Sequence, residues 1–175
     1  MTILVFDPSG NYNEGKGTTG FAQYYNNKLI FVGQIRAESF DSQHEYWEHH
    51  SLLIDTVGPD VVVIENYKLF ASTKDAQINS ELETSQLIGV LKFHCTAKKI
   101  HVRLQEPQIK HRFSNEILLR KKIISQDKQK RYYAVGVPIS RHIIDAIRHG
   151  EYYINFKLKK ESFYDSSNKD NNRAN

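Results

Sequence analysis

The chain has 175 residues, of which 39% are hydrophobic and 11% aromatic, so it is long enough to bury one core and short for two. We expect one domain over residues 1–156 and a disordered polar tail over residues 161–175. No apolar run is long enough to cross a bilayer, and the first residues lack the basic region and cleavage site of a signal peptide. The single cysteine, Cys95, excludes an internal disulfide. These features predict a cytoplasmic protein with no membrane segment.

The net charge of +4 is unevenly distributed along the chain. Residues 1–97 contain 6 Lys and Arg against 12 Asp and Glu, whereas residues 98–131 contain 11 against 3. Such a basic segment suits a surface that binds a polyanion such as nucleic acid. An ordinary solvated Lys and Arg face explains the charge equally well, so charge alone does not decide between the two.

The first third of the chain carries the signals of a strand, a hairpin and a helix. Residues 3–6 form an apolar run that ends at the turn signal Asp-Pro-Ser-Gly. Residues 18–25 and 29–36 are rich in β-forming residues and are joined by two asparagines, which tolerate the left-handed conformation of tight hairpin turns. A capping box then starts a helix over residues 42–57, which a Gly-Pro pair ends.

The rest of the chain alternates between strands and helices. Residues 61–64 are apolar at every position, as expected of a strand that is covered on both faces. We predict a long helix over residues 75–97, a strand over residues 100–104 and, after the basic segment, a last helix over residues 140–153 with a serine as its N-cap.

This order of elements predicts an α/β fold with a five-stranded mixed sheet, in which an antiparallel hairpin and parallel strands are flanked by helices. A helical crossover after the hairpin returns the strand of residues 61–64 parallel to the first strand. Ligands of such sheets bind at the carboxyl ends of the strands, where the winding reverses. Asp7 and Glu65 end these two strands, so we expect both side chains at that edge.

Four residues together suggest a metal site. Carboxylates on adjacent strand ends, as expected for Asp7 and Glu65, repel each other unless they bind a cation or share a proton. His142 and Asp145 project from one face of the last helix and can supply further ligands. Each piece has a simpler explanation: a turn after Asp7, a strand end meeting water at Glu65, and a surface hydrogen bond between His142 and Asp145. The combination favours a site, because one fold would bring all four together.

Three segments resemble the catalytic pattern of the RuvC-type Holliday-junction resolvases, members of the RNase H-like superfamily: LVFDPSG, VVVIEN and HIIDAIRH. In that family the positions that match Asp7, Glu65 and Asp145 are metal-binding carboxylates, and the position that matches His142 is Asp in some members and His in others. The resemblance is closest to the bacteriophage versions. The sequence departs from the family between residues 121 and 138, where cellular members have a Gly- and Ala-rich run, which affects the cleavage-sequence preference.

The resemblance implies an RNase H-like nuclease domain with the activity of a crossover junction endodeoxyribonuclease. The substrate would be branched DNA, chiefly four-way junctions, and the cofactor would be two Mg²⁺ or Mn²⁺ ions held by the four candidate residues. A phage-encoded protein would act in the cytoplasm of a bacterial host. Family members dimerise through the helix that corresponds to residues 75–97. Since that helix is apolar on more than one face, a partner subunit or the chain's own last helix must cover the side turned away from the sheet.

Further residues are candidates for DNA contact. Lys16 lies in a glycine-containing loop that resembles a P-loop but lacks its Ser or Thr, so we expect it to meet a substrate phosphate and not a nucleotide. Tyr67 and Phe70 follow Glu65, and either ring would stack on an unpaired base or pack on the next helix. The other candidates are basic: Lys110, in a Pro-x-x-Lys segment that resembles a family feature, Arg112, Arg120, Lys121, Lys122 and Arg141.

Three other functions remain open at this stage. The protein would be a less selective nuclease that also cuts forks and flaps, a catalytically silent junction-binding module, or an RNase H that acts on RNA–DNA hybrids. Mutually repelling carboxylates argue against a silent module, and His142 matches the usual acidic tetrad of RNase H poorly.

Overall fold

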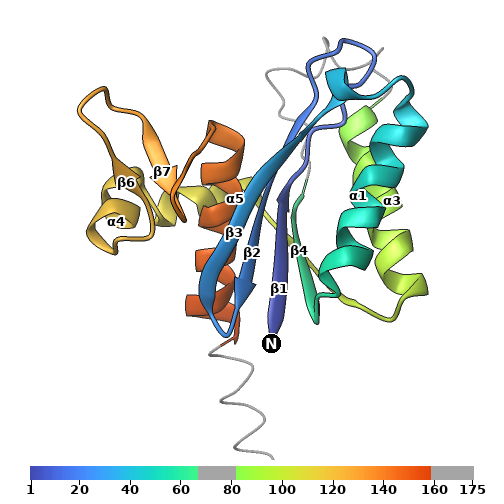
Figure 1. Cartoon of the computed structure of the whole chain (residues 1–175). Helices are drawn as coiled ribbons and strands as arrows, with labels where there is room; N and C mark the ends of the chain where they lie inside the picture. The colour runs from blue at the N-terminus through green and yellow to red at the C-terminus, as the bar shows by residue number, and fades with distance from the viewer. Residues whose placement is uncertain (67–81, 159–175) are drawn as a thin grey trace, which may run out of the picture.

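The computed structural model describes residues 1–66 and 82–158, which form a five-stranded mixed sheet with helices on both faces (Figure 1). The strand order is β3-β2-β1-β4-β5. β1 pairs antiparallel with β2 and parallel with β4, and β4 pairs parallel with β5. The strands are β1 Thr2–Asp7, β2 Thr18–Tyr25, β3 Lys28–Arg36, β4 Val61–Glu65 and β5 His101–Gln105. The predicted sheet is therefore confirmed, including the hairpin and the parallel return of β4.

Three longer helices cover the sheet, α1 Gln43–Val57 and α3 Glu83–Ala97 on one face and α5 Arg141–Tyr152 on the other (Figure 1). The predicted caps explain two of the boundaries. Ser42 accepts a hydrogen bond from a backbone N–H in the first turn of α1, and Ser140 does the same for α5. None of the described helices is long and apolar enough to cross a membrane.

The side chains of β1 alternate between two separate cores. Ile3 and Val5 pack under α5, whereas Leu4 and Phe6 pack under α1 and α3. All four side chains are fully buried, as the apolar run predicts. Because side chains two positions apart share a face, Asp7 continues the row of Ile3 and Val5 and points to the α5 side. The two-residue period of the strand thus places the acidic residue under the last helix.

The helix predicted over residues 75–97 begins later than expected. In the structure α3 starts at Glu83, because Leu82 has a left-handed backbone with φ 49° that cannot continue a helix. Residues 75–81 lie outside the described residues. The first turn of α3 receives the loop after β1: Glu83 accepts from the backbone N–H of Asn13 and Thr84 accepts from that of Gly10. The start of the helix therefore holds this loop.

The basic segment has more structure than the sequence predicts. It contains a 3-10 helix at Pro107–Arg112, α4 at Asn115–Arg120, and a small sheet of β6 Ser125–Gln126, β7 Tyr132–Ala134 and β8 Val137–Pro138. The small sheet projects from the body of the molecule next to α5 (Figure 1). Buried Leu118, Ile124 and Ala134 join this part to the α5 core.

The end of the chain continues α5 beyond its predicted limit. A π-helix over Tyr153–Leu158 follows directly, and buried Tyr153 and Ile154 anchor it in the α5 core. The predicted disordered tail, residues 161–175, lies outside the described residues.

Candidate active site

A row of paired residues crosses the sheet at the end of β1. Asp7 pairs with Gly20 on β2, which pairs with Gln34 on β3, and Glu65 on β4 pairs with Gln105 on β5. Phe6 and Ile64 are partners, so the residues that follow them, Asp7 and Glu65, are neighbours. Directly paired residues point to the same face of a sheet. The row therefore presents polar side chains to α5 from four of the five strands, and the glycine of β2 leaves a gap between them.

Gly20 allows α5 to approach this row closely. A Cβ atom at Gly20 would lie 2.2 Å from the backbone carbonyl of His142, so no larger residue fits there without moving the helix. The close approach brings the Nδ1 atom of His142 to 2.8 Å from Oδ2 of Asp7. Gly20 thus has a structural role, because it seats the helix that carries two of the four candidate ligands.

The three carboxylates of Asp7, Glu65 and Asp145, which we call the carboxylate cluster, converge on the side chain of Lys110. The Nζ atom of Lys110 lies 2.9 Å from Glu65 Oε2, 3.1 Å from Asp145 Oδ2 and 3.7 Å from Asp7 Oδ1. The four predicted ligands are therefore brought together, with an ammonium group among them. We had expected Lys110 to contact a phosphate. The structure instead places its partly buried side chain among the carboxylates, because the 3-10 helix after β5 directs it toward the ends of the strands.

Arg148 holds Asp145 from the other side. Its Nη1 atom donates to Asp145 Oδ1 over 2.6 Å, and its Nη2 atom donates to the side chain of Asn115 over 2.9 Å. The spacing of three residues places Arg148 and Asp145 on the same face of α5. Arg148 is not among the residues predicted from the sequence, although its spacing from a candidate carboxylate is a usable signal.

His149 and Gln105 were also missed. His149 is fully buried, and its Nε2 atom lies 2.9 Å from Glu65 Oε2 while its Nδ1 atom lies 2.8 Å from Gln105 Oε1. It follows Asp145 by four residues, so both side chains face the strand ends. A histidine among buried helix positions looks like a core residue in the sequence, and only the fold shows its partners.

The carboxylate cluster has strongly shifted pKa values. Burial, together with the neighbouring Glu65, raises the pKa of Asp7 to about 7 in spite of its hydrogen bond with His142. Burial also disfavours the charged form of Glu65, but hydrogen bonds from His149 and Lys110 outweigh it and lower the pKa of Glu65 to about 2. The hydrogen bond with Asp7 raises the pKa of His142. Asp7 and His142 therefore bind protons more readily than isolated groups would.

Within residues 1–66 and 82–158, no three His, Cys, Asp or Glu side chains stand ready to hold a metal ion. One oxygen atom of each carboxylate in the cluster faces Lys110 instead. The donor set itself, three carboxylates and one imidazole, is of the kind that Mg²⁺ and Mn²⁺ take. The residues therefore fit a divalent cation in their chemistry, provided that the Lys110 ammonium gives up its position.

The remaining DNA-contact candidates differ in their placement. Lys16 and Arg141 are exposed, and Arg141 precedes His142 on α5. Lys121 lies near Glu151 at the other end of α5, with the two charged groups 3.7 Å apart. Arg112, Arg120 and Lys122 are exposed. Tyr67 and Phe70 lie outside the described residues.

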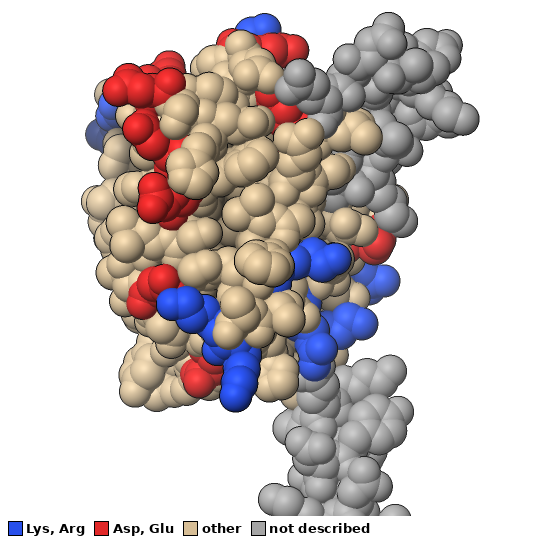
Figure 2. Space-filling model, turned by 90° about the vertical axis from the view of Figure 1, so that its right-hand side faces the viewer, with Lys and Arg blue, Asp and Glu red and all other residues tan. Residues whose placement is uncertain are grey.

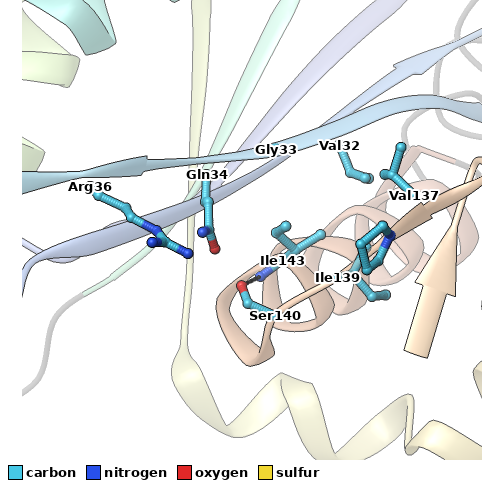
Figure 3. Close-up of a pocket in the computed structure, with 9 residues that line it drawn as sticks. Val32, Gly33, Gln34, Arg36, Val137, Ile139, Ser140 and Ile143 are labelled. Carbon is cyan, nitrogen blue, oxygen red and sulfur yellow. Dashed lines mark hydrogen bonds between the residues drawn. The ribbon is translucent and has the colours of Figure 1, made fainter. Parts of the chain in front are cut away.

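A pocket of about 420 Å³ opens beside the N-terminus of α5, between β3 and the segment that joins β8 to the helix (Figure 3). Val32 and Ile143 contribute apolar walls. At its polar end, with the Gln34 amide turned over, that side chain donates to Ser140 Oγ over 2.9 Å and accepts from the Arg36 guanidinium. Since Gln34 belongs to the same row as Asp7, the pocket adjoins the His142 side of the site.

The fold is similar to that of solved structures. RuvC of Thermus thermophilus in complex with a Holliday junction substrate is 13% identical and covers 90% of this chain and 96% of its own, with a TM-score of 0.59. A second structure of Thermus thermophilus RuvC is 11% identical and covers 88% and 95%, with a TM-score of 0.57. The fowlpox virus resolvase with its Holliday junction DNA is 18% identical and covers 87% and 96%, with a TM-score of 0.47. Neither protein-family models nor the sequences of curated proteins give a match. The chain has the RNase H-like fold of RuvC, as its sequence motifs imply.

Proposed function

We propose that the protein is a metal-dependent endonuclease that resolves four-way DNA junctions. The observation that carries the proposal is the convergence of Asp7, Glu65 and Asp145 on one point, from β1, β4 and α5. The similarity to RuvC bound to a Holliday junction supports the choice of substrate. The looser alternative, an enzyme that also cuts forks and flaps, uses the same site and differs only in selectivity.

The electrostatics of the carboxylate cluster favour a cation. Three carboxylates that are at most 13% exposed repel one another unless positive charge lies between them. Lys110 and Arg148 supply two positive charges for three carboxylates, and burial beside Glu65 raises the pKa of Asp7 to about 7, so the cluster is under-neutralised. We propose that two Mg²⁺ or Mn²⁺ ions per site take the place of the ammonium. Asp7, Glu65, His142 and Asp145 would hold these ions.

Each residue of the site then has a distinct task. Bound divalent ions supply Lewis acidity and stabilise the attacking and leaving oxygens of a phosphodiester. Asp7 and His142 must give up their protons before they can act as ligands, and Arg148 keeps the Asp145 carboxylate oriented through its 2.6 Å hydrogen bond. In this proposal Lys110 meets the substrate phosphate once it is released from the carboxylates.

A second copy of the chain is proposed to cover the face of α1 and α3. Figure 2 shows this face, with a broad central area free of charged side chains, mostly acidic residues above it and mostly basic residues below. Two large apolar side chains of these helices are exposed, Leu52 by 58% and Phe93 by 78%. A groove of about 460 Å³ between the helices adds further area, including Trp47. A dimer through this face would present two active sites to the twofold-symmetric junction.

The dimer is tested by sedimentation of the natural protein and of Phe93→Glu. We expect a dimer for the natural protein and a monomer for the variant, because a buried unpaired carboxylate is costly. A natural protein that sediments as a monomer at micromolar concentration would rule out this interface.

The activity is tested on four nucleic-acid substrates: a four-way DNA junction, a DNA fork, a linear DNA duplex and an RNA–DNA hybrid. Each is incubated with Mg²⁺ or Mn²⁺ and again with EDTA. We expect paired nicks in the junction that EDTA abolishes. Equal cutting of forks would favour the looser nuclease, cutting of the hybrid alone would favour an RNase H, and tight junction binding without cutting would favour a silent module.

A further inference from the structure

We propose that His149, braced by Gln105, is a positioning residue that fixes the Glu65 carboxylate for cation binding. The inference rests on the proposed function, since it concerns one of its proposed ligands. It adds two residues that the four-ligand pattern does not contain.

The geometry connects three structural elements through one imidazole ring. Glu65 ends β4, Gln105 ends β5, and the two are paired neighbours in the sheet. The ring of His149, on α5, lies between them and contacts both, at 2.9 Å from Glu65 Oε2 and 2.8 Å from Gln105 Oε1. Since a carboxylate only accepts hydrogen bonds, the Nε2 atom of His149 donates to Glu65. The Nε2 atom of His149 therefore carries a hydrogen.

The amide of Gln105 completes the arrangement. It is 6% exposed, and its Nε2 atom has no hydrogen-bond partner among the residues that the structure describes. Turned over, the same amide donates from its Nε2 atom to Nδ1 of His149, so the ring can hold Glu65 as a neutral imidazole. In either orientation Gln105 fixes the plane of the ring. Both nitrogens of this fully buried ring are thus engaged by polar side chains, and one of these side chains is a proposed cation ligand.

His149 differs from Lys110, the other donor to the same oxygen. Both lie 2.9 Å from Glu65 Oε2. Lys110 sits where a cation would bind and has a flexible side chain, whereas His149 is fully buried on a packed helix and cannot withdraw. His149 is therefore the donor that stays on Glu65 when Lys110 leaves. Because it contacts only Oε2, it keeps the carboxylate oriented and leaves Oε1 without a hydrogen bond from His149. Such outer hydrogen bonds orient ligands and increase cation affinity.

Two variants separate positioning from packing. The amide nitrogen of a glutamine side chain reaches the place of imidazole Nε2, whereas that of asparagine reaches only the place of Nδ1. His149→Gln thus keeps the donor to Glu65 and loses the contact with Gln105, and His149→Asn does the reverse. Each variant gives up one buried hydrogen bond, so both should lose similar thermal stability. Only the asparagine variant should lose the orientation of Glu65.

The first readout is binding of Mn²⁺ alone to the DNA-free protein, measured by calorimetry. We expect His149→Asn to weaken Mn²⁺ binding by about 10- to 100-fold and His149→Gln to recover most of this loss. The second readout is junction cleavage, for which kcat should fall by a similar factor in the asparagine variant while KM stays unchanged. Gln105→Met, which removes the brace and keeps the volume, should shift Mn²⁺ binding in the same direction by a smaller factor.

His50 provides a matched control. It is also a fully buried histidine with both ring nitrogens engaged, but its partners are Tyr46 and Thr19 on the opposite face of the sheet. His50→Gln should lower the melting temperature and leave Mn²⁺ affinity unchanged.

The inference is overturned if His149→Asn binds Mn²⁺ like the natural protein, or if the glutamine and asparagine variants lose affinity equally. If the natural protein binds no Mn²⁺ and cuts no junction, the proposed function itself fails, and the inference fails with it. Natural binding and cleavage together with an unaffected asparagine variant would overturn the inference alone.

Discussion

Two buried polar clusters lie on opposite faces of the same sheet, and they are built differently. The cluster under α1 is neutral: the Thr19 hydroxyl contacts His50 Nε2 at 2.9 Å and Tyr46 Oη at 3.1 Å, and Tyr46 donates to the backbone of Ser9. Burial lowers the pKa of His50 to about 4 and raises that of Tyr46 to about 12, which keeps both groups uncharged at neutral pH.

The cluster under α5 is built from ionisable side chains, and several of them carry charge. Its carboxylates, Lys110 and Arg148 approach one another within 4 Å, and Asp7 and His142 still hold protons at neutral pH more readily than isolated groups would. A structural cluster minimises buried charge, as the first one does, whereas the second keeps more carboxylates than its own cations neutralise. This difference marks the α5 face as the functional one. Each of the following predictions tests it by changing one of the two clusters.

The largest effect is expected from the carboxylates themselves. Asp7→Asn, Glu65→Gln and Asp145→Asn should each slow junction cleavage by at least about 10³-fold, or ~4 kcal/mol, because each removes a ligand charge. Junction binding should stay nearly intact, since the basic surface supplies affinity. Single-turnover cleavage and gel-shift titrations with Mn²⁺ check both. Comparable residual cutting by all three variants would argue against the metal site.

The next effect concerns His142. His142→Ala should slow cleavage by about 100-fold, or ~2.7 kcal/mol, and His142→Asp should retain a substantial part of the rate, because a carboxylate can replace an imidazole as ligand. Mn²⁺ should outperform Mg²⁺ by a wider margin with His than with Asp at this position, since imidazole prefers the softer ion. Rates with each metal measure both effects. Natural-rate cleavage by His142→Ala would reduce the site to three ligands.

The sequence already indicated the ligands in these two predictions, because short local patterns identify them. A carboxylate at the end of an apolar run and two polar residues three positions apart on a helix can be read without a structure. His149 and Gln105 could not be identified because their roles arise from β5 pairing with β4, a contact between distant segments. The sequence indicated Lys110 as a DNA-contact residue, but its carboxylate partners depend on the 3-10 helix after β5.

The fold shows the same limit. Long apolar runs and helical periods predicted the five main strands and the three long helices, apart from the start of α3. The small sheet escaped prediction because its strands have only two or three residues, too few for a period to appear. It is held together by pairing and by the turn in which Asp127 accepts from Arg131, 2.9 Å away, and neither leaves a periodic pattern in the sequence.

A smaller effect is expected in the neutral cluster, as a dependence of stability on pH. In the folded protein His50 resists protonation down to a pKa of about 4, whereas in the unfolded chain it binds a proton at its ordinary pKa of 6.5. Its contribution is therefore complete above pH 6.5 and is lost as the pH falls toward 4. Between pH 7 and pH 5 this should cost about 2 kcal/mol. Denaturant unfolding of the natural protein and of His50→Gln checks the difference, which should shrink at pH 5. If the free energies of unfolding of the two proteins changed with pH in parallel, this would contradict a neutral His50.

The smallest effect concerns single phosphate contacts. Arg141→Gln, next to the site, should reduce the salt dependence of junction affinity by about one unit of slope. Lys28→Gln removes an exposed charge in the β2–β3 turn, at the other end of these strands from Asp7, and should leave the slope unchanged. Affinities measured from low to moderate salt provide the test. Equal slopes for Arg141→Gln and the natural protein would place the DNA surface elsewhere.

The central claim is that a divalent cation replaces Lys110 within the carboxylate cluster. A crystal structure of the protein with Mn²⁺, with anomalous data collected at the manganese edge, tests this claim most directly. We predict an anomalous peak bound by Asp7, Glu65 and Asp145, with the Nζ atom of Lys110 moved away from all three. A structure at saturating Mn²⁺ in which Lys110 keeps its contacts of 2.9 Å and 3.1 Å with Glu65 and Asp145, and no peak lies beside them, would contradict it.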